Sequence, residues 1–392
     1  MGIEEAEKQP EASTNPPEGT IDVSVVLPCL NEEQTVATCV LKARQWFESA
    51  RLRGEVIVVD NGSTDRSRER AREAGARLID EPRRGYGAAH LRGFAEARGR
   101  VIVMADADDT YDLSDLGPLI EPLSRGYDMV VGNRLKTLSP GSMTWSHRFI
   151  GTPALTALLS LFSGSRLGDS QCGLRAFTRE AYERISPKSA GMELASEMIL
   201  KGARKGLRMT EVPIPYHPRV AESKLSTFRD GWRHLRFLLL HTPTYAFFFP
   251  GVALFLIGLL SLGVTLARAG GIRIGSLDWQ PLFAGGILLA IGSNSLILGV
   301  ATSLYAESKG IIGEGRLIQF YRDHLSLERV LLFGVALLLV GGGLDVYIFY
   351  EWLRHGEAAP NVAGIAAVAQ SCLIIGANVC LGGFLAALID IE

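Results

Sequence analysis

The sequence predicts an α/β domain with a mostly parallel sheet, followed by a bundle of four transmembrane helices. Up to about residue 240, short apolar runs alternate with charged helical patterns, and repeated units of this kind form parallel sheets covered by helices. Beyond that point, long stretches contain almost no charge. Acidic clusters directly follow two of the apolar runs, at the strand ends where open α/β sheets bind ligands.

Five apolar runs in the first half predict strands, and the segments between them predict helices. The strands are expected at 23–27, 55–59, 77–79, 101–104 and 129–131. The helices are expected at 32–49, 66–74, 88–97 and 113–123. Residues 149–162 are also apolar, but this stretch is too short to cross a bilayer. We therefore expect it to pack inside the soluble domain.

Four segments of the second half approach the roughly 20 apolar residues that a bilayer-spanning helix needs. They are 246–267, 281–305, 330–350 and 363–388. The loop between the second and third spans is basic, with Lys309, Arg316, Arg322 and Arg329. Because basic loops stay on the cytoplasmic side, we expect an integral membrane protein whose α/β domain and both termini face the cytoplasm.

These patterns divide the chain into four regions. Residues 1–20 are acidic and proline-rich and predict a disordered tail. Residues 21–222 are expected to form the α/β domain, 223–245 an interfacial helical region, and 246–392 the transmembrane domain. In the interfacial region, apolar and basic residues fall on different faces of one helix, namely Phe228, Trp232, Leu235 and Leu239, and Arg229, Arg233 and Arg236. Arginines that only anchor the domain by snorkelling explain this pattern equally well.

Composition excludes some classes of function. The net charge of −2 over 392 residues argues against bulk nucleic-acid binding. The five cysteines show no metal-ligand spacing, which is typical of a protein in a reducing compartment.

The acidic clusters are the candidate site. Asp60 begins a turn-rich stretch that ends at Asp65, and Asp106 begins the second cluster with Asp108 and Asp109. Each cluster taken alone is explained as a turn or a helix cap. Together with a polar loop at 31–33 after the first strand, they place three loops along the same edge of the sheet, and an Asp-x-Asp there is suited to hold a divalent metal against a diphosphate.

Motifs in a fixed order carry a family resemblance over residues 22–240. They lie at 25–33, 58–65, 84–89, 106–112, 132–134, 169–173, 211–216, 223–225 and 230–234. In order and spacing they resemble the family 2 glycosyltransferases of the GT-A fold, in the polyprenyl-phosphate branch that includes dolichyl-phosphate mannose and glucose synthases. The resemblance implies a Rossmann-like nucleotide-sugar domain.

The resemblance also implies roles on the donor side. It places the base and ribose beside Pro28, Asn31, Glu32 and Asp60. Arg84, Gly85 and Gly87 precede a helix and would allow close approach of the donor, although a plain glycine-rich loop fits as well. Asp106 and Asp108 would reach the nucleotide sugar and a Mg²⁺ or Mn²⁺ ion, with Asp108 as the best metal ligand.

On the acceptor side the resemblance implies a polyprenyl monophosphate. A phosphate monoester with a second pKa of about 6 is largely ionised at neutral pH, so a strong general base is dispensable. The enzyme must then supply cations and proximity. The candidates are Arg134, Arg148, Arg219, Ser223 and Lys224, and the charged ones are equally well explained as surface ion-pair partners.

Asp169 and Gln171 stand where the family positions sugar hydroxyls or the reacting oxygen. We expect Asp169 to orient substrate or to serve as a base, with a helix cap as the structural alternative. The 169–173 motif is closer to glucosyl than to mannosyl synthases, so UDP-glucose is favoured over GDP-mannose as the donor.

The expected activity is the transfer of one hexose, with inversion, to a lipid phosphate by a metal-dependent membrane enzyme. Ala221 departs from the family pattern, which usually has glycine there. A processive polysaccharide synthase is one alternative, but its Gln-x-x-Arg-Trp motif is absent and the nearest string, at 319–323, differs in its last residue. A non-catalytic membrane scaffold is another. The four spans are interpreted as an anchor, a lipid-entry groove or a homo-oligomer contact.

Overall fold

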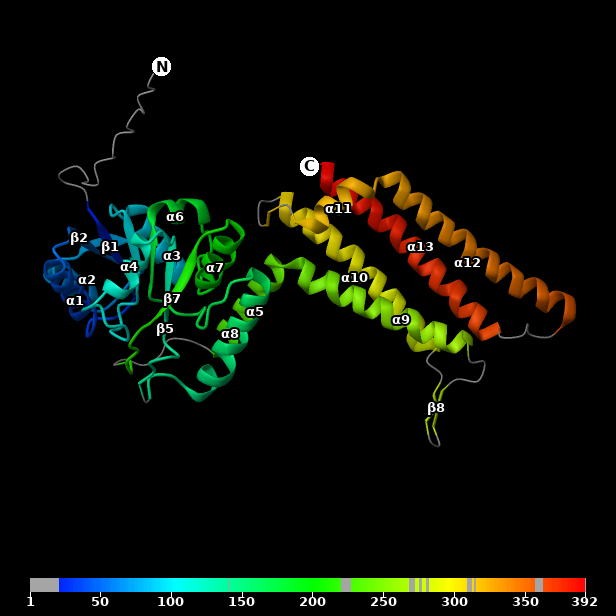
Figure 1. The fold of residues 1–392 in the computed structure, drawn as a ribbon, viewed down its shortest axis with the longest axis horizontal. Coiled ribbons are helices and arrows are strands. Elements are labelled where there is room, and N and C mark those ends of the chain that lie inside the picture. Colours follow the sequence, from blue (N-terminus) through cyan, green and yellow to red (C-terminus); the bar gives the residue numbers. More distant parts are fainter. Residues whose placement is uncertain are drawn as a thin grey trace, which may run out of the picture. The chain divides into compact units, whose positions relative to one another are not determined.

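The computed structural model describes residues 21–139, 141–219, 227–267, 272–274, 277–279, 282–308, 312–313, 315–356 and 362–391. The chain divides into two compact units, a first unit of Met1–Leu235 and a second unit of Arg236–Glu392 (Figure 1). The expected tail at 1–20 lies outside the described residues, as do Ala221, Ser223 and Lys224.

A seven-stranded sheet forms the centre of the first unit. Its strands lie in the order β3-β2-β1-β4-β6-β5-β7, and β6 alone runs antiparallel to its neighbours. The mostly parallel sheet is therefore confirmed. The strands are β1 (Val23–Cys29), β2 (Gly54–Asp60), β3 (Arg77–Asp80), β4 (Val101–Met104), β5 (Met129–Asn133), β6 (Arg175–Thr178) and β7 (Met209–Pro213).

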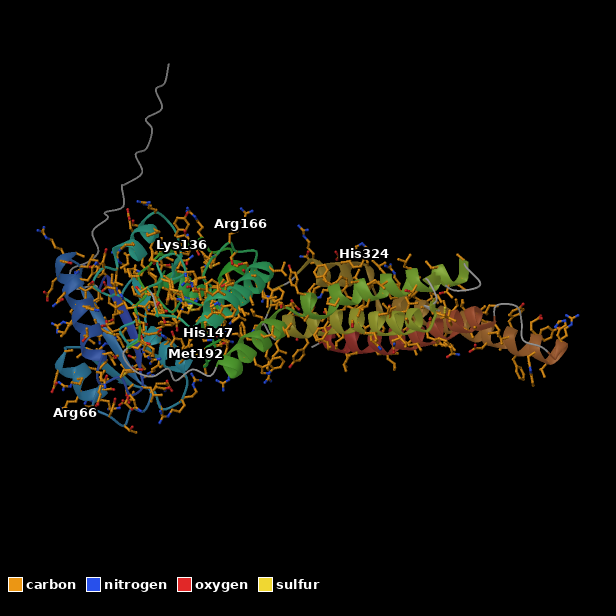
Figure 2. The ribbon with its side chains drawn as sticks, turned by 90° about the horizontal axis from the view of Figure 1, so that it is seen from below. Arg66, Lys136, His147, Arg166, Met192 and His324 are labelled. Atoms are coloured by element: carbon orange, nitrogen blue, oxygen red, sulfur yellow. The ribbon has the colours of Figure 1, made fainter. Side chains whose placement is uncertain are left out.

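Helices cover this sheet and bury its central strands, as both faces of a parallel sheet require. Val25, Ile57 and Val103 on three neighbouring strands are completely buried. Exposed charges such as Arg66, Lys136 and Arg166 lie on the surface of the unit (Figure 2). The helices of this unit are α1 (Val36–Ser49), α2 (Ser67–Glu73), α3 (Tyr86–Glu96), α4 (Gly117–Ser124), α5 (Thr152–Ser163), α6 (Arg179–Ile185) and α7 (Leu194–Arg204), with a π-helical turn η1 (His147–Gly151) before α5. The residues of α8 (Thr227–His241) are divided between the two units at Leu235.

The first helix starts later than predicted. It was expected from residue 32, but α1 begins at Val36 because the preceding loop is held by other partners. Asn31 has a left-handed backbone with φ of 55°. The backbone N–H of Glu32 donates to Ser67 Oγ at 2.7 Å, and that of Glu33 to Asp65 Oδ2 at 3.2 Å.

The apolar stretch at 149–162 does not pack inside the first unit as expected. Only one face of α5, with Thr152, Thr156 and Leu159, is buried. Phe149 and Leu161 are 56% and 60% exposed. The expectation failed because a helix in an outer layer of the unit has only one face to bury against it, and here that face is partly polar.

Four helices of the second unit are long and apolar enough to cross a membrane, namely Thr244–Ala267, Leu282–Ser308, Leu327–His355 and Val362–Asp390. They comprise the π-helical turn η2 (Thr244–Phe248) with α9 (Phe249–Ala267), and then α10 (Leu282–Ser308), α12 (Leu327–His355) and α13 (Val362–Ile391). A short hairpin of β8 (Ile272–Ile274) and β9 (Leu277–Trp279) follows α9. All four predicted spans are thus present as helices.

Glycines bring these helices together. A Cβ at Gly258 in α9 would lie 2.9 Å from the Gly285 carbonyl oxygen of α10, and one at Gly341 in α12 would lie 2.7 Å from the Ala369 carbonyl oxygen of α13. Small residues permit such close packing in lipid, where the hydrophobic effect does not drive helices together. The amphipathic helix α11 (Arg316–His324) contributes Ile318 and Tyr321 to a cluster with α10 and α13.

Candidate active site

The site lies at the carboxyl ends of β1, β2 and β4, where the strand order places β1 between β2 and β4. Ligands of open α/β sheets bind beside such a switch in strand order. Hydrogen bonds join the three loops: Thr35 Oγ1 donates to the Ala107 carbonyl at 2.7 Å, and the Thr64 N–H donates to Asn31 Oδ1 at 2.7 Å. The structure therefore brings together the three polar loops that the sequence placed on one edge.

Asp60 is buried at the end of β2, and Pro28 lies near the end of β1. Asp60 accepts hydrogen bonds from the backbone N–H of Gly62 and of Ser63, and from Arg68 Nη1 at 2.8 Å. Burial by itself would raise the pKa of Asp60, but the hydrogen bonds from Ser63 and Arg68 outweigh it, so the pKa is lowered. This carboxylate stays ionised and its loop is fixed.

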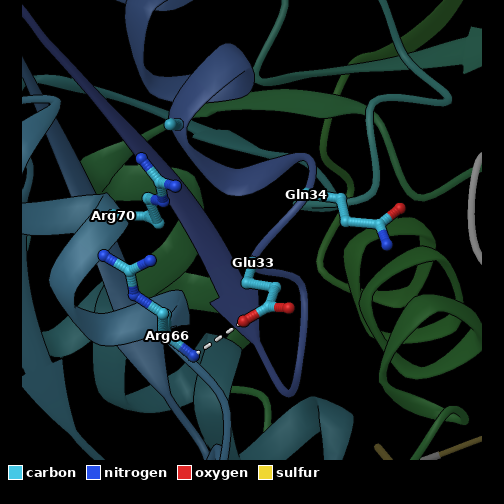
Figure 3. Close-up of a pocket in the computed structure, with 5 residues that line it drawn as sticks. Glu33, Gln34, Arg66 and Arg70 are labelled. Atoms are coloured by element: carbon cyan, nitrogen blue, oxygen red, sulfur yellow. Dashed lines mark hydrogen bonds between the residues drawn. The ribbon is translucent and has the colours of Figure 1, made fainter.

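A pocket of about 460 Å³ lies beside these loops, lined by Glu33, Gln34, Ala37, Arg66 and Arg70 (Figure 3). Glu33 Oε2 accepts the backbone N–H of Arg66 at 3.0 Å across its rim. None of the predicted site residues lines this pocket. It lies beside the candidate site and does not coincide with it.

Gly85 and Gly87 are needed for packing at the start of α3. A Cβ at Gly85 would lie 2.3 Å from the Ala190 carbonyl oxygen, and one at Gly87 would lie 2.2 Å from that of Ser189. Gly85 also has a φ of 147°, which L side chains rarely adopt. Arg84 Nη1 donates to the Asn61 carbonyl at 2.6 Å. These contacts explain both glycines without a ligand, so a role for them in donor binding stays a prediction.

Asp106 stands at the centre of the site. Its Oδ1 accepts the hydroxyl of Tyr86 at 2.9 Å, and a Cβ at Gly173 would lie 3.0 Å from its Oδ2. Burial and the neighbouring charge of Asp108 raise the pKa of Asp106 to about 7. Arg134 and Arg219 oppose this rise, so the carboxylate lies within the electrostatic reach of both arginines.

Asp108 is held from two sides. Its Oδ1 accepts the Thr110 hydroxyl at 2.6 Å, and its Oδ2 lies 3.4 Å from Arg219 Nε. Arg219 Nη2 also donates to Glu32 Oε1 at 2.7 Å. Arg219 therefore joins the β1 loop to the acidic cluster of β4.

The two aspartates fit a divalent cation as a partial ligand set. Carboxylate oxygens are the ligands that Mg²⁺ prefers, and Mg²⁺ commonly takes one or two carboxylates together with substrate phosphates and water. Burial raises the pKa of Asp106, and the like charge of Asp108 adds to that rise; a cation between the two carboxylates would neutralise this like charge. Across the part of the chain that the structure describes, no group of three or more His, Cys, Asp or Glu side chains is placed to hold a metal by itself.

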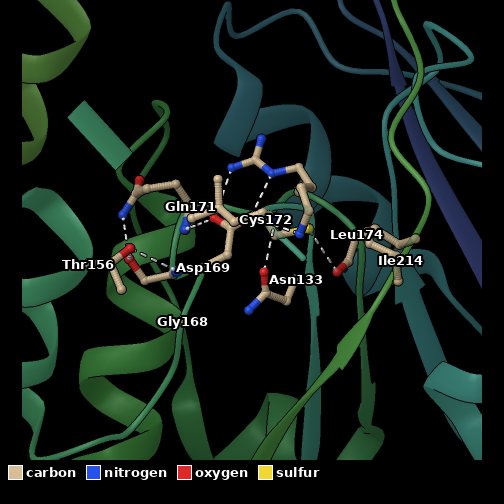
Figure 4. Close-up of polar contacts among 12 residues, drawn as sticks. Asn133, Thr156, Gly168, Asp169, Gln171, Cys172, Leu174 and Ile214 are labelled. Carbon is tan, nitrogen blue, oxygen red and sulfur yellow. Dashed lines mark hydrogen bonds and ion pairs between the residues drawn. The ribbon is translucent and has the colours of Figure 1, made fainter. Parts of the chain in front are cut away.

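Arg134 and Asp169 form a buried bidentate ion pair. Figure 4 shows Asp169 with the neighbouring Gly168 and Gln171. Arg134 Nε donates to Asp169 Oδ2 at 2.8 Å and its Nη2 to Oδ1 at 2.9 Å. The backbone N–H of Arg134 and of Gln171 donate to the same carboxylate. Asp169 is completely buried and both its oxygens are occupied. In this structure the carboxylate orients Arg134, and a role of Asp169 in substrate orientation or as a base stays a prediction.

The remaining predicted residues lie apart from the acidic cluster or outside the description. Gln171 Nε2 donates to Ser170 Oγ at 3.0 Å and to Ser196 Oγ at 3.3 Å. Arg148 is exposed in η1, with its guanidinium 5.1 Å from the ring centroid of Phe149. Ser223 and Lys224 belong to the residues that the structure does not describe.

Sequence reasoning missed three residues that build the site. Tyr86 binds Asp106, and Arg68 bridges Asp60 and Asp80. Arg175 in β6 is completely buried and donates to the carbonyl oxygens of Cys172, Ala195 and Ser170 at 2.6–2.8 Å. Its place within an apolar strand, at 174–177, was a signal that could have been used. Arg175 fixes the 169–173 loop, which carries Asp169 and brings Gly173 to Asp106.

Comparison with known families agrees with this geometry. Residues 24–186 match Glycosyl transferase family 2, and residues 300–390 match the Glycosyltransferase family 2 C-terminal transmembrane region. This chain is a family 2 glycosyltransferase. The family assignment confirms the resemblance drawn from the sequence motifs, together with the fold class. The protein is thus an integral membrane glycosyltransferase.

Relatives of this glycosyltransferase include two proteins of Haloferax volcanii. The low-salt glycan biosynthesis hexosyltransferase Agl6 is 37% identical over 368 residues, which cover 93% of this chain and 88% of the relative. A dolichyl-phosphate hexose transferase is 35% identical over 211 residues, which cover 54% of this chain and 89% of the relative. A similar solved structure is glucosyl-3-phosphoglycerate synthase from Mycobacterium tuberculosis with Mn²⁺, UDP and glucosyl-3-phosphoglycerate, at 23% identity and a TM-score of 0.44 over 56% of this chain and 78% of that one.

Proposed function

We propose that this glycosyltransferase moves one hexose, with inversion, from a nucleotide sugar to a polyprenyl monophosphate, with UDP-glucose as the preferred donor. The observation that carries the proposal is the pairing of Asp106 and Asp108 at the end of β4 with Arg219, and with Arg134 nearby. Carboxylates for a metal and cations for phosphate are thereby available at one place. The name of the dolichyl-phosphate hexose transferase relative and the four candidate spans support a lipid acceptor.

On the donor side, Asp106 and Asp108 would hold Mg²⁺ or Mn²⁺. A bound divalent cation supplies Lewis-acid stabilisation of the negative charge on the departing nucleoside diphosphate. Tyr86 fixes the orientation of Asp106 through its hydrogen bond, and Thr110 does the same for Asp108. The protein thus prepares two oriented carboxylates before the donor arrives, which reduces the cost of reorganisation.

On the acceptor side, the arginines provide the charge that a phosphate requires. Arg219 lies against Asp108 Oδ2, so a cation at this carboxylate would compete with the guanidinium for the same oxygen. We infer that Arg219 then becomes available to the acceptor phosphate. Arg134, which Asp169 holds in a fixed direction, would serve the same phosphate or the donor diphosphate. Bidentate guanidinium geometry suits both groups.

A lipid phosphate needs no strong general base, because it is already largely ionised at neutral pH. What the enzyme must supply is an in-line approach of a phosphate oxygen to the anomeric carbon. The new bond forms between that oxygen and the anomeric carbon while the bond to the nucleoside diphosphate breaks. The buried position of Asp169 is compatible with a mechanism in which it transfers no proton.

The decisive experiment uses the purified full chain with polyprenyl phosphate, Mg²⁺ or Mn²⁺ and a panel of nucleotide sugars. Mass spectrometry of the lipid product should show a single added hexose, largest in amount with UDP-glucose. A larger yield with GDP-mannose would make GDP-mannose the preferred donor, but the class of reaction would stay the same. Products with several sugars in a chain would instead identify a processive synthase, and no product with any donor would reject the transferase proposal.

Membrane orientation is part of the same proposal, with the first unit and both chain ends on the cytoplasmic side. A membrane-impermeant maleimide added to intact cells should fail to label a cysteine introduced at Leu41, which is 47% exposed on α1. Labelling of this site without breaking the cells would place the first unit on the opposite side.

A further inference from the structure

Helix α10 carries an exposed amide side chain near the centre of a candidate membrane span. Asn294 is exposed and lies at the middle of this helix, which has 27 residues. At a rise of about 1.5 Å per residue, both ends of the helix are about 20 Å away. An asparagine side chain is too short to reach the lipid headgroups over this distance, so its amide lies at the depth of the hydrocarbon core.

The opposite side of α10 packs inside the second unit. Gly285, Gly292 and Gly299 follow one another at intervals of seven residues, and all three meet the first span (Figure 1). A Cβ at Gly292 would lie 2.5 Å from the backbone nitrogen of Phe255 in α9. Asn294 follows Gly292 by two residues, which is a rotation of about 200° around an α-helix. This close packing fixes the rotation of α10 and directs Asn294 away from α9.

Asn294 interrupts an apolar stripe on the exposed side of α10. The neighbouring side chains of this stripe are Ile287, Ile291 and Leu298, which are 59%, 48% and 43% exposed. They lie three or four residues from the next member, so all of them follow one side of the helix. We call this surface, with Asn294 at its centre, the α10 face. A single asparagine within an Ile and Leu stripe is a pattern that sets the register and number of associating helices.

The hydrogen-bonding groups of Asn294 have no partner among the described residues of one copy of the chain. Other polar side chains of the spans do have partners. The Thr302 hydroxyl donates to the Leu298 carbonyl oxygen at 2.6 Å, and the exposed amide of Gln370 donates to Asp345 Oδ2 at 3.3 Å. Lipid tails offer neither donors nor acceptors, and an amide left unsatisfied in hydrocarbon is unfavourable. A partner from outside the chain is therefore required.

The chemistry of the amide favours a second copy of the chain as this partner. The side chain of asparagine has an acceptor oxygen and two donor hydrogens, so two of them can each donate to the other across a two-fold axis. All copies cross the membrane in the same direction and hold Asn294 at the same depth. A different protein would need a polar group at this same depth. Contacts in which both copies use the same surface are also the commonest kind in oligomers.

We propose that the α10 face is the contact between two copies of this chain in the membrane, with the two Asn294 amides hydrogen-bonded to each other near a two-fold axis. Ile291 and Leu298, on either side of Asn294, pack against their counterparts in the partner. The contact involves the second unit alone. It is independent of the donor, the acceptor and the reaction proposed above.

The first experiment measures association of the purified full chain in liposomes. Copies that carry a donor or an acceptor dye on a terminal tag are mixed, and energy transfer is followed as the protein-to-lipid ratio is lowered. Asn294→Leu keeps an apolar stripe but removes the hydrogen bonds, so association should weaken about tenfold. Asn294→Gln keeps an amide and should associate nearly as well as the unsubstituted chain.

Gln370→Leu is the matched control for this experiment. It also replaces an exposed amide of a span by leucine, but that amide has its partner in Asp345 of the same chain. Association of this variant should equal that of the unsubstituted chain. Thermal unfolding of all variants in detergent shows whether each one is folded.

Cross-linking then locates the contact without changing Asn294. Cys372 and Cys380 are only partly buried and are replaced by alanine, while the other three cysteines are buried. Ile291→Cys and Leu298→Cys place single thiols on the α10 face, and Leu339→Cys places one on α12, where the side chain is 72% exposed. Mild oxidation in liposomes should link two copies through position 291 or 298, but not through position 339.

Three results would overturn the proposal. The first is the same association for Asn294→Leu as for the unsubstituted chain. The second is equal cross-linking at positions 291, 298 and 339, because the copies would then meet without a preferred surface. The third is no energy transfer between unsubstituted copies at any protein-to-lipid ratio, since the amide would then have no second copy to bind.

Discussion

The first unit buries its large apolar side chains, whereas the second unit exposes many of them. In the first unit, strands such as β1 are buried along nearly their whole length, and the surface carries charges. In the second unit, Leu332, Leu339 and Leu381 are each more than 70% exposed on their helices. The difference follows from the solvent that each unit meets, since water favours burial of apolar surface and lipid does not.

The units also differ in how they treat charge. In the first unit, Asp169 and Arg175 are completely buried, and each makes several hydrogen bonds that compensate for lost hydration. Within the described spans of the second unit, Asp345 is the Asp, Glu, Lys or Arg side chain farthest from the helix ends. It is half-buried and accepts a hydrogen bond from Gln370 at 3.3 Å. The comparison teaches that buried charge positions the site in one unit and is avoided in the other.

The strongest test of the first unit concerns its acidic cluster. Asp108→Asn removes the charge that we assign to the metal, and transfer should fall on the order of 10²–10³-fold, the range for loss of one electrostatic contact in a transition state. Single-turnover rates with the lipid acceptor measure this. Asp109→Asn is the matched control, because Asp109 pairs with Lys42 at 2.8 Å and lies outside the proposed metal set. Equal losses in both variants would remove the special role of Asp108.

The buried ion pair gives the next largest effect. Asp169→Asn leaves the Arg134 cation without its charge partner in the interior, and such a loss costs about 3–5 kcal/mol. Thermal unfolding of the full chain in detergent should show a large drop in Tm. Replacing both residues, as Arg134→Met with Asp169→Leu, should recover part of that drop, since no uncompensated charge remains. A double variant less stable than the single one would mean that the pair contributes more than mutual neutralisation.

In the second unit, loss of a charged side chain should be favourable, whereas in the first unit it is unfavourable. Asp345→Leu removes a carboxylate from the apolar part of α12, and insertion of this helix should improve by about 3 kcal/mol. A glycosylation-mapping assay on the full chain measures the inserted fraction. Glu351→Leu, closer to the end of α12, should change insertion less. Unchanged insertion together with lost transfer would assign Asp345 a functional role and break the contrast between the units.

The smallest effect concerns His90, which is completely buried with neither ring nitrogen bonded to any described residue. Its ring stacks on Phe94 at 5.4 Å between centroids. His90→Phe should therefore stabilise the first unit by about 1 kcal/mol. A thermal shift at pH 7 measures this, and a lower Tm for the variant would show that the imidazole has a partner of its own.

The pH dependence of that variant has a definite sign. Burial lowers the pKa of His90 to about 3, well below its unfolded value of about 6.5. As the pH falls below 6.5 the unfolded chain binds a proton that the folded chain excludes, so the native protein loses stability. The advantage of His90→Phe should consequently grow from pH 7 to pH 5. An advantage that stays constant over this range would mean that His90 is not kept neutral.

Local pattern alone determined much of this protein. Apolar runs of strand length gave the positions of β1, β2 and β4, and the long uncharged stretches gave all four spans, because hydrophobic periodicity and length depend only on neighbours in the chain. The loops at the ends of β1, β2 and β4 were also predictable, because the carboxyl ends of parallel strands lie at the same edge of the sheet.

Tertiary structure alone decided which side chains meet. The sequence predicted Asp169 beside substrate, but only the structure shows that Arg134, at another strand end, donates to both of its carboxylate oxygens. Arg175 stands out in the sequence as a charge within an apolar run, but its partners, backbone carbonyls brought near by folding, could not be predicted. The exposure of one face of α5 was equally unpredictable, because an apolar run does not tell whether a helix is buried on all sides or on one side only. Such pairings depend on contacts between residues distant in the chain, and periodicity carries no information about them.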